Sequence, residues 1–275
     1  MELLKFHPLF FSTVTIHALI DDSVIPLVYC LIKDKAENTY TRVFEKFKEL
    51  KPSLNPQSIM SDFEKTTHNA IQRVFPEARL VGCLFHLSQC LWRKVQELCL
   101  AHLYQENEEI RMAVKMMLAL SFVPSYGVFD SFEEFVQACP NEITLLADYW
   151  EDTYIGRRRK NQRASPRFAV HIWNLNDPID DNLQRTNNSM EAWHRAFQQR
   201  IDCNHPSVFK LINRFRFEQD HVESEIERRQ SGGNHPEASK KKCLQLNRGL
   251  QAVVSTYANT SLMEYLRSVA NNLEL

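Results

Sequence analysis

The stretch "QSIMSDFEKTTHNAIQRVFPEARLVGCLFH", residues 57–86, contains the alternation of elements that decides the fold. A short apolar strand over 57–62 leads into a helix with Ala70, Ile71 and Val74 at helical spacing. A second apolar strand follows over 78–85. Two strands joined by a helix predict a parallel crossover, the connection that α/β proteins use.

The segments on either side extend this pattern. Residues 9–20 and 24–33 are rich in β-branched and aromatic side chains and flank "DDS" at 21–23, which predicts a hairpin. A helix is expected over 38–50 with Asn38 as its N-cap, and another follows the last strand. The predicted order up to residue 100 is strand, strand, helix, strand, helix, strand, helix.

The remaining two thirds of the chain are predicted to be mainly helical. Ser131 and Glu134 match a capping box, a helix is expected beyond Pro206, and Ser261 with Glu264 is expected to begin the last helix. The expected organisation is an α/β part, a helical insertion, a helix with Glu191, and a helical C-terminal extension, over residues 1–100, 101–182, 183–204 and 205–275 respectively.

Composition excludes several classes of protein. Apolar residues make up 44% of the 275 residues, which is too many for a disordered chain. The formal net charge of −1 gives no overall attraction to nucleic acid, so any such binding would depend on local patches. The seven cysteines are scattered and odd in number, which favours reduced thiols in an intracellular protein. No apolar run approaches the ~20 residues of a membrane span.

Two acidic residues stand at the start of predicted helices. Asp62 ends an apolar strand just before a helix, so it is either an N-cap or a carboxylate facing the cleft at a sheet edge. Glu191 lies in "LQRTNNSMEAWHRAF", residues 183–197, where Asn188 and Glu191 form a variant of the capping box. Taken alone, this local pattern favours capping for both residues.

Two further motifs suggest binding chemistry. Cys83 and His86 have a Cys-x2-His spacing, but a structural zinc site needs four ligands, and only Cys203 and His205 match in residue type. The alternative is a buried thiol beside a hydrogen-bonded histidine. The basic run "RRRK" comprises Arg157, Arg158, Arg159 and Lys160, which either contact DNA phosphates or form a solvated loop.

Three segments together resemble the transposase domain of Mutator-like elements (MULE). They are residues 9–50, residues 61–100 and "RTNNSMEAWHRAF" at 185–197, in the family's order and spacing. The shared motifs are an Asp-Phe-Glu segment, then Cys-x2-His, then Asn-Asn before Glu and Trp-His. The resemblance covers about residues 5–205.

This resemblance implies a ribonuclease-H-like mixed sheet with an incomplete first strand, a helical insertion and an Asp-Asp-Glu site. Asp62 would be the second acid and Glu191 the third, holding Mg²⁺ for phosphoryl transfer on DNA. By the same resemblance the protein would act on transposon ends in the nucleus, and a homo-oligomer is an open alternative to a monomer.

The sequence departs from the family's pattern at the first acid. Counting back from Pro8, Leu9 and Phe10 puts that aspartate's place at Met1. We therefore expect the chain as written to have little or no strand-transfer activity. It is either an N-terminally truncated transposase or a domesticated module that binds DNA or protein without catalysis.

Overall fold

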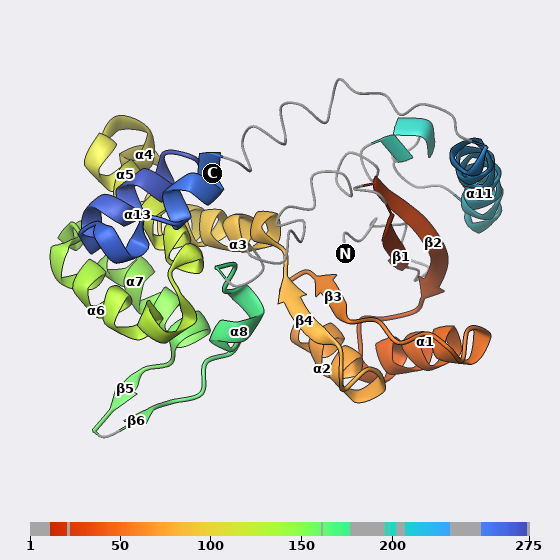
Figure 1. The fold of residues 1–275 in the computed structure, drawn as a ribbon, viewed down its shortest axis with the longest axis horizontal. Helices are drawn as coiled ribbons and strands as arrows, with labels where there is room; N and C mark the ends of the chain where they lie inside the picture. The colour runs from red at the N-terminus through yellow and green to blue at the C-terminus, as the bar shows by residue number, and fades with distance from the viewer. Residues whose placement is uncertain are drawn as a thin grey trace. The chain divides into compact units, whose positions relative to one another are not determined.

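A computed structural model of the protein describes residues 12–20, 23–160, 162–176, 196–197, 199–201, 207–231 and 249–273. The chain divides into two compact units, each with a core of its own. The first comprises Met1–Leu80 and Thr186–Pro236, and the second comprises Val81–Arg185 and Glu237–Leu275. Figure 1 shows the elements coloured along the chain. The fold is mixed α/β, as predicted.

The first unit begins with the predicted hairpin. Strands β1 (Ser12–Ile20) and β2 (Ser23–Ile32) pair antiparallel over their whole length. The register shifts once, because Ile16 faces Val28 whereas His17 faces Pro26. Proline has no amide hydrogen to donate, and a bulge is one of the places where a sheet accepts it.

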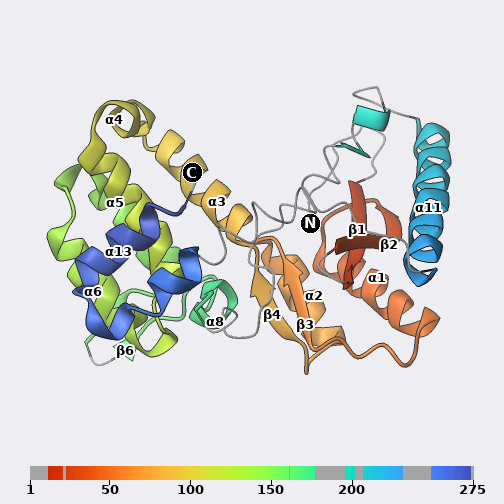
Figure 2. The same cartoon turned by 45° about the horizontal axis from the view of Figure 1, so that its top comes forward.

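Helices α1 (Glu37–Leu50) and α2 (Lys65–Val74) pack side by side in the first unit (Figure 2). The rings of Phe44 and Phe75 meet edge to face with centroids 6.4 Å apart. The prediction of Asn38 as N-cap is wrong, since α1 begins at Glu37. Asp34 instead orders the turn before α1, because its Oδ1 accepts from the Ala36 amide at 3.1 Å and the Thr39 hydroxyl at 2.6 Å.

Strands β3 (Ser58–Ser61) and β4 (Arg79–Gly82) form a second two-stranded sheet. Their arrows run the same way in Figure 1, and the Arg79 amide donates to the carbonyl of Gln57 at 2.9 Å, where both strands begin. Helix α2 connects them, so the predicted parallel crossover is confirmed. Helix α3 (Leu84–Glu97) starts directly after Cys83, which makes β4 shorter than the apolar run suggested.

The second unit is largely helical. It includes α3, and its further elements before residue 156 are α4 (Ala101–Glu106), α5 (Glu108–Ala119), η1 (Leu120–Phe122), η2 (Ser125–Gly127), α6 (Val128–Ala138), η3 (Asn141–Ile143), α7 (Thr144–Trp150) and η4 (Glu151–Ile155). The predicted capping box at Ser131 is wrong, because α6 begins three residues earlier at Val128. A short hairpin of β5 (Arg158–Arg159) and β6 (Gln162–Arg163) and helix α8 (Val170–Trp173) follow.

The core of the second unit is aromatic and draws on both ends of that unit. Trp150, Tyr154 and Trp173 are fully buried, and the Trp173 indole donates to the Tyr154 carbonyl at 3.0 Å. After η5 (Tyr257–Asn259), α13 (Leu262–Ala270) packs against α5 and begins after Ser261 as predicted. The Ser261 hydroxyl donates to Glu264 Oε2 at 2.7 Å and does not bond the first-turn amides. The Tyr265 hydroxyl donates to the Phe122 carbonyl at 2.6 Å, which fixes α13 in place.

The first unit is completed by α11 (Val208–Gln230), the helix predicted beyond Pro206, which lies along β2 (Figures 1 and 2). Phe215 stacks on Tyr29 of β2 with centroids 4.7 Å apart and on Phe197 at 5.6 Å. Phe197, Ile201 and Leu211 form a small buried cluster at this contact. Packing of aromatic rings therefore anchors both α11 and the helical residues near 200 to the hairpin.

The described strands form three separate two-stranded sheets. None of the described helices is long and apolar enough to cross a membrane.

Candidate functional site

The backbone of Asp62 is held firmly where β3 gives way to α2. Its carbonyl oxygen accepts hydrogen bonds from the Ser61 hydroxyl at 3.2 Å, the Glu64 amide at 3.0 Å and His68 Nε2 at 2.7 Å. Three donors on one carbonyl fix the direction in which the chain leaves the strand. These contacts to its main-chain carbonyl hold the residue in place, whereas the side-chain Oδ1 takes no part in them.

The carboxylate of Asp62 does not cap the helix that follows it. The N-cap of α2 is Glu64, and no side chain bonds to the first-turn amides. Asp62 Oδ1 is buried and has no hydrogen-bond partner among the described residues. Burial, together with the nearby negative charge of Glu64, raises the pKa of Asp62. Such orphaned buried polar atoms are rare and call for a ligand or another explanation, so the capping interpretation of Asp62 is wrong.

The neighbouring acid, Glu64, is fully engaged. Its Oε2 accepts from the Tyr40 hydroxyl at 2.9 Å and the Thr67 hydroxyl at 3.3 Å, and its Oε1 lies 3.7 Å from Lys35 Nζ. Burial and the Glu64 charge raise the pKa of Tyr40, so its phenol stays protonated and donates. Glu64 is therefore a structural acid that joins α1 to α2.

His68 supports Asp62 from within α2. Burial is the largest cause that lowers its pKa, to about 4, although the hydrogen bond to Asp62 opposes this shift. A neutral imidazole whose Nε2 faces a carbonyl must carry its proton on that nitrogen. His68 is thus a positioning residue that fixes the end of β3.

Cys83 and His86 lie in the second unit, at the start of α3. The Cys83 thiol is fully buried, and the half-buried His86 ring meets Phe85 edge to face at 5.6 Å. Within the described residues, no group of three or more His, Cys, Asp or Glu side chains is arranged to hold a metal ion. Cys203 and His205 lie outside the described residues, so the zinc prediction stays a prediction.

The basic run occupies the β5–β6 hairpin, and two of its four cations are paired with acids. Arg157 forms an ion pair with Asp152, and Arg158 Nη1 donates to Glu133 Oε2 at 2.9 Å. Glu133 also forms an ion pair with Arg163, and Arg163 in turn pairs with Glu151 at 3.1 Å. Arg159 and Lys160 are exposed at the tip and form no ion pair with the described residues. The charge available to a phosphate is therefore concentrated at these two residues.

The sequence pattern did not single out three residues around Asp62. Two of them had a signal in the sequence that could have identified them: Glu64 belongs to the Asp-Phe-Glu motif, and His68 is a polar residue on the apolar side of α2. Tyr40 lies 24 residues away from Glu64, and only the packing of α1 on α2 brings the two together. The predicted third acid, Glu191, and its Asn188 lie outside the described residues.

Residues 5–90 match the family model described as the MULE transposase domain. This span contains both the parallel crossover and Asp62 with its supporting contacts. The resemblance to Mutator-like element transposases is therefore confirmed over these residues. Neither a curated protein nor a solved structure matches the chain.

Proposed function

We propose that the chain is a DNA-binding module derived from a transposase, with a remnant of the divalent metal site at Asp62. The observation that carries this proposal is the buried, unpartnered Oδ1 of Asp62 at the end of a strand inside the matched segment. A structural acid would have a partner, as Glu64 does. A buried carboxylate oxygen without a partner, Oδ1 of Asp62, fits a ligand that arrives from outside.

The donor chemistry suits a hard cation. Mg²⁺ and Mn²⁺ prefer carboxylate oxygens, and sites of this kind use one or two carboxylates together with substrate phosphates. Asp62 would provide one ligand and Glu191, by resemblance, another. When bound, divalent ions polarise a phosphodiester and stabilise its leaving oxygen. The chain's own contribution would be to hold Asp62 rigidly through His68 and the Ser61 hydroxyl.

The finer parts of the resemblance are part of the same proposal. These are a ribonuclease-H-like arrangement of the sheet, a nuclear location and binding to transposon ends. Strand cleavage by the 275-residue chain is expected to be absent or nearly so, because Met1 stands where the family's pattern has its first aspartate. Metal-dependent cleavage that Glu191→Gln abolishes would overturn this expectation.

The test is DNA binding with and without Mn²⁺. Fluorescence anisotropy with a labelled oligonucleotide should show tighter binding by the wild type when Mn²⁺ is added, because a cation held by Asp62 would add positive charge for the phosphates of DNA. Asp62→Asn should remove the Mn²⁺ effect, whereas Asp130→Asn, an exposed acid on α6, should retain it. If Mn²⁺ raises the DNA affinity of the wild type and of Asp62→Asn by the same factor, the proposed metal site is refuted. Absence of DNA binding would refute the module's function.

A further inference from the structure

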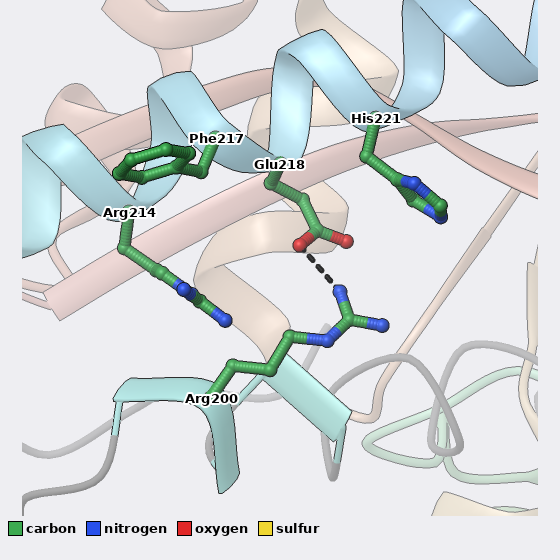
Figure 3. Close-up of a pocket in the computed structure, with 5 residues that line it drawn as sticks. All are labelled: Arg200, Arg214, Phe217, Glu218 and His221. Carbon is green, nitrogen blue, oxygen red and sulfur yellow. Dashed lines mark hydrogen bonds and ion pairs between the residues drawn. The ribbon is translucent and has the colours of Figure 1, made fainter.

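A cavity of about 320 Å³ lies in the first unit, where α11 meets the helical residues near 200. Its lining consists of Arg200, Arg214, Phe217, Glu218 and His221 (Figure 3). Its volume is within the range of small-ligand sites. The lining combines two guanidinium groups, an imidazole and one carboxylate, so cationic groups predominate. Asp62 does not line this cavity, and none of the residues on which the proposed function rests does so.

One of the two arginines, Arg200, neutralises a buried carboxylate of the protein. Glu218 lies on the apolar stripe of α11 with Leu211 and Val222, and its side chain is only 4% exposed. A buried carboxylate requires a charged or hydrogen-bonding partner. Arg200 meets this need, since its Nη1 donates to Glu218 Oε2 at 2.6 Å. The ion pair also fixes the guanidinium of Arg200 at the cavity wall.

The second arginine, Arg214, is not needed to neutralise Glu218, because Arg200 already pairs with that carboxylate. Arg214 precedes Glu218 by one helical turn, and its guanidinium extends into the same space as that of Arg200 (Figure 3). Its Nε is buried and has no hydrogen-bond partner within the part of the chain that the structure describes. An unsatisfied buried donor on a cation is costly unless an anion satisfies it. The cavity is therefore prepared for an anionic group.

The aromatic residue at the rim indicates what kind of anion fits. Phe217 is 68% exposed, and its ring lies beside Arg214 in Figure 3. A large exposed ring adds nothing to the binding of a free phosphate. It does provide a stacking surface for a base, and arginines beside stacking aromatics are typical of sites for single-stranded nucleic acid.

We propose that this cavity binds single-stranded DNA, with a backbone phosphate at Arg214 and Arg200 and an adjacent base stacked on Phe217. The choice of DNA over a free anion rests on the proposed function. Arg214 supplies its unsatisfied Nε donor, and the guanidinium of Arg200, held in place by Glu218, supplies further donors. An unpaired strand fits because a base in a duplex has no free face for Phe217.

The test compares pocket variants with a variant of equal charge elsewhere in the unit. Labelled oligo-dT, a duplex of equal length and an oligonucleotide with abasic positions are titrated by fluorescence anisotropy at several salt concentrations. The variants are Arg214→Gln, Phe217→Ala and Arg42→Gln, the last on the exposed side of α1. Arg200 is left intact, because its removal would strand the buried charge of Glu218.

Arg214→Gln should weaken oligo-dT binding about tenfold or more and lower the salt slope by about 0.7. Phe217→Ala should weaken oligo-dT binding about fivefold and leave the abasic oligonucleotide unchanged. Arg42→Gln should leave both affinities close to those of the wild type.

Pocket variants that behave like Arg42→Gln, while the wild type binds DNA, would overturn this proposal and leave the proposed function standing. Displacement of oligo-dT by an equal concentration of inorganic phosphate would assign the cavity to a free anion and also overturn it. A wild type that binds none of the oligonucleotides would overturn both proposals together.

Discussion

Replacement of Asp62 by asparagine should stabilise the protein, although it changes a residue of the candidate site. An unsatisfied buried polar group costs about 1–3 kcal/mol. Asparagine leaves the same oxygen without a partner but removes the charge, and burial of a charged group costs more than burial of a neutral one. Because Asp62 is only half-buried as a whole, we expect a gain of about 1 kcal/mol. A gain of this size raises the melting temperature by about 2–4 °C in a chain of this length.

The neighbouring acid provides a matched control. Glu64→Gln removes the same charge two residues away, but Glu64 accepts from Tyr40 and Thr67 and pairs with Lys35. Loss of those charge-assisted contacts should lower the unfolding free energy by about 1 kcal/mol. The two substitutions are therefore expected to have opposite signs.

The assay is thermal and urea unfolding of the two variants and the wild type in metal-free buffer at pH 7. If Asp62 served as a helix cap instead, Asp62→Asn would be nearly neutral and Asp62→Ala would cost about 0.5–2 kcal/mol. We expect both Asp62 variants to be at least as stable as the wild type. Clear destabilisation of Asp62→Ala together with a neutral Asp62→Asn would refute the reasoning.

Three further predictions concern other parts of the molecule. Gly156 has φ +88°, and a Cβ there would lie 1.9 Å from the Ala164 carbonyl oxygen. Gly156→Ala should therefore destabilise the second unit by at least about 1–2 kcal/mol in thermal unfolding, whereas Gly249→Ala should leave its stability unchanged. Burial raises the pKa of the Cys30 thiol, so mass spectrometry should find that Cys30 is alkylated more slowly than exposed Cys99 at pH 8. The difference between the two rates should narrow as pH rises, and equal rates at pH 8 would contradict the burial of Cys30. Combined replacement of Arg159 and Lys160 by glutamine should weaken DNA binding more than Arg157→Gln, because Arg157 is paired with Asp152; the reverse order in an anisotropy titration would contradict this.

The order of elements up to α3 could be predicted from the sequence because each element there has its own periodic apolar pattern. The hairpin, the crossover and α11 follow from such local patterns. Helix starts were less predictable. Asn38 and Ser131 both match capping patterns, but α1 is preceded by an ordering contact from Asp34, and packing extends α6 back to Val128.

Contacts between distant segments could not be predicted from local patterns. The partners of Glu64 come from α1, and α13 reaches α5 across more than a hundred residues of chain. The Arg214–Glu218 cavity had a signal that is easy to overlook. Glu218 interrupts the apolar stripe of α11 at a position where a hydrophobic residue would be expected. A buried acid of this kind indicates that a basic partner, here Arg200, lies nearby in space.

The central claim is that Asp62 keeps its carboxylate available for a divalent cation within a transposase-derived fold. The most direct measurement is a titration of the metal-free protein with Mn²⁺, followed by electron paramagnetic resonance of the free ion. Wild type and Glu64→Gln should each remove Mn²⁺ from solution, and Asp62→Asn should remove much less. Equal Mn²⁺ uptake by the wild type and Asp62→Asn would contradict the account.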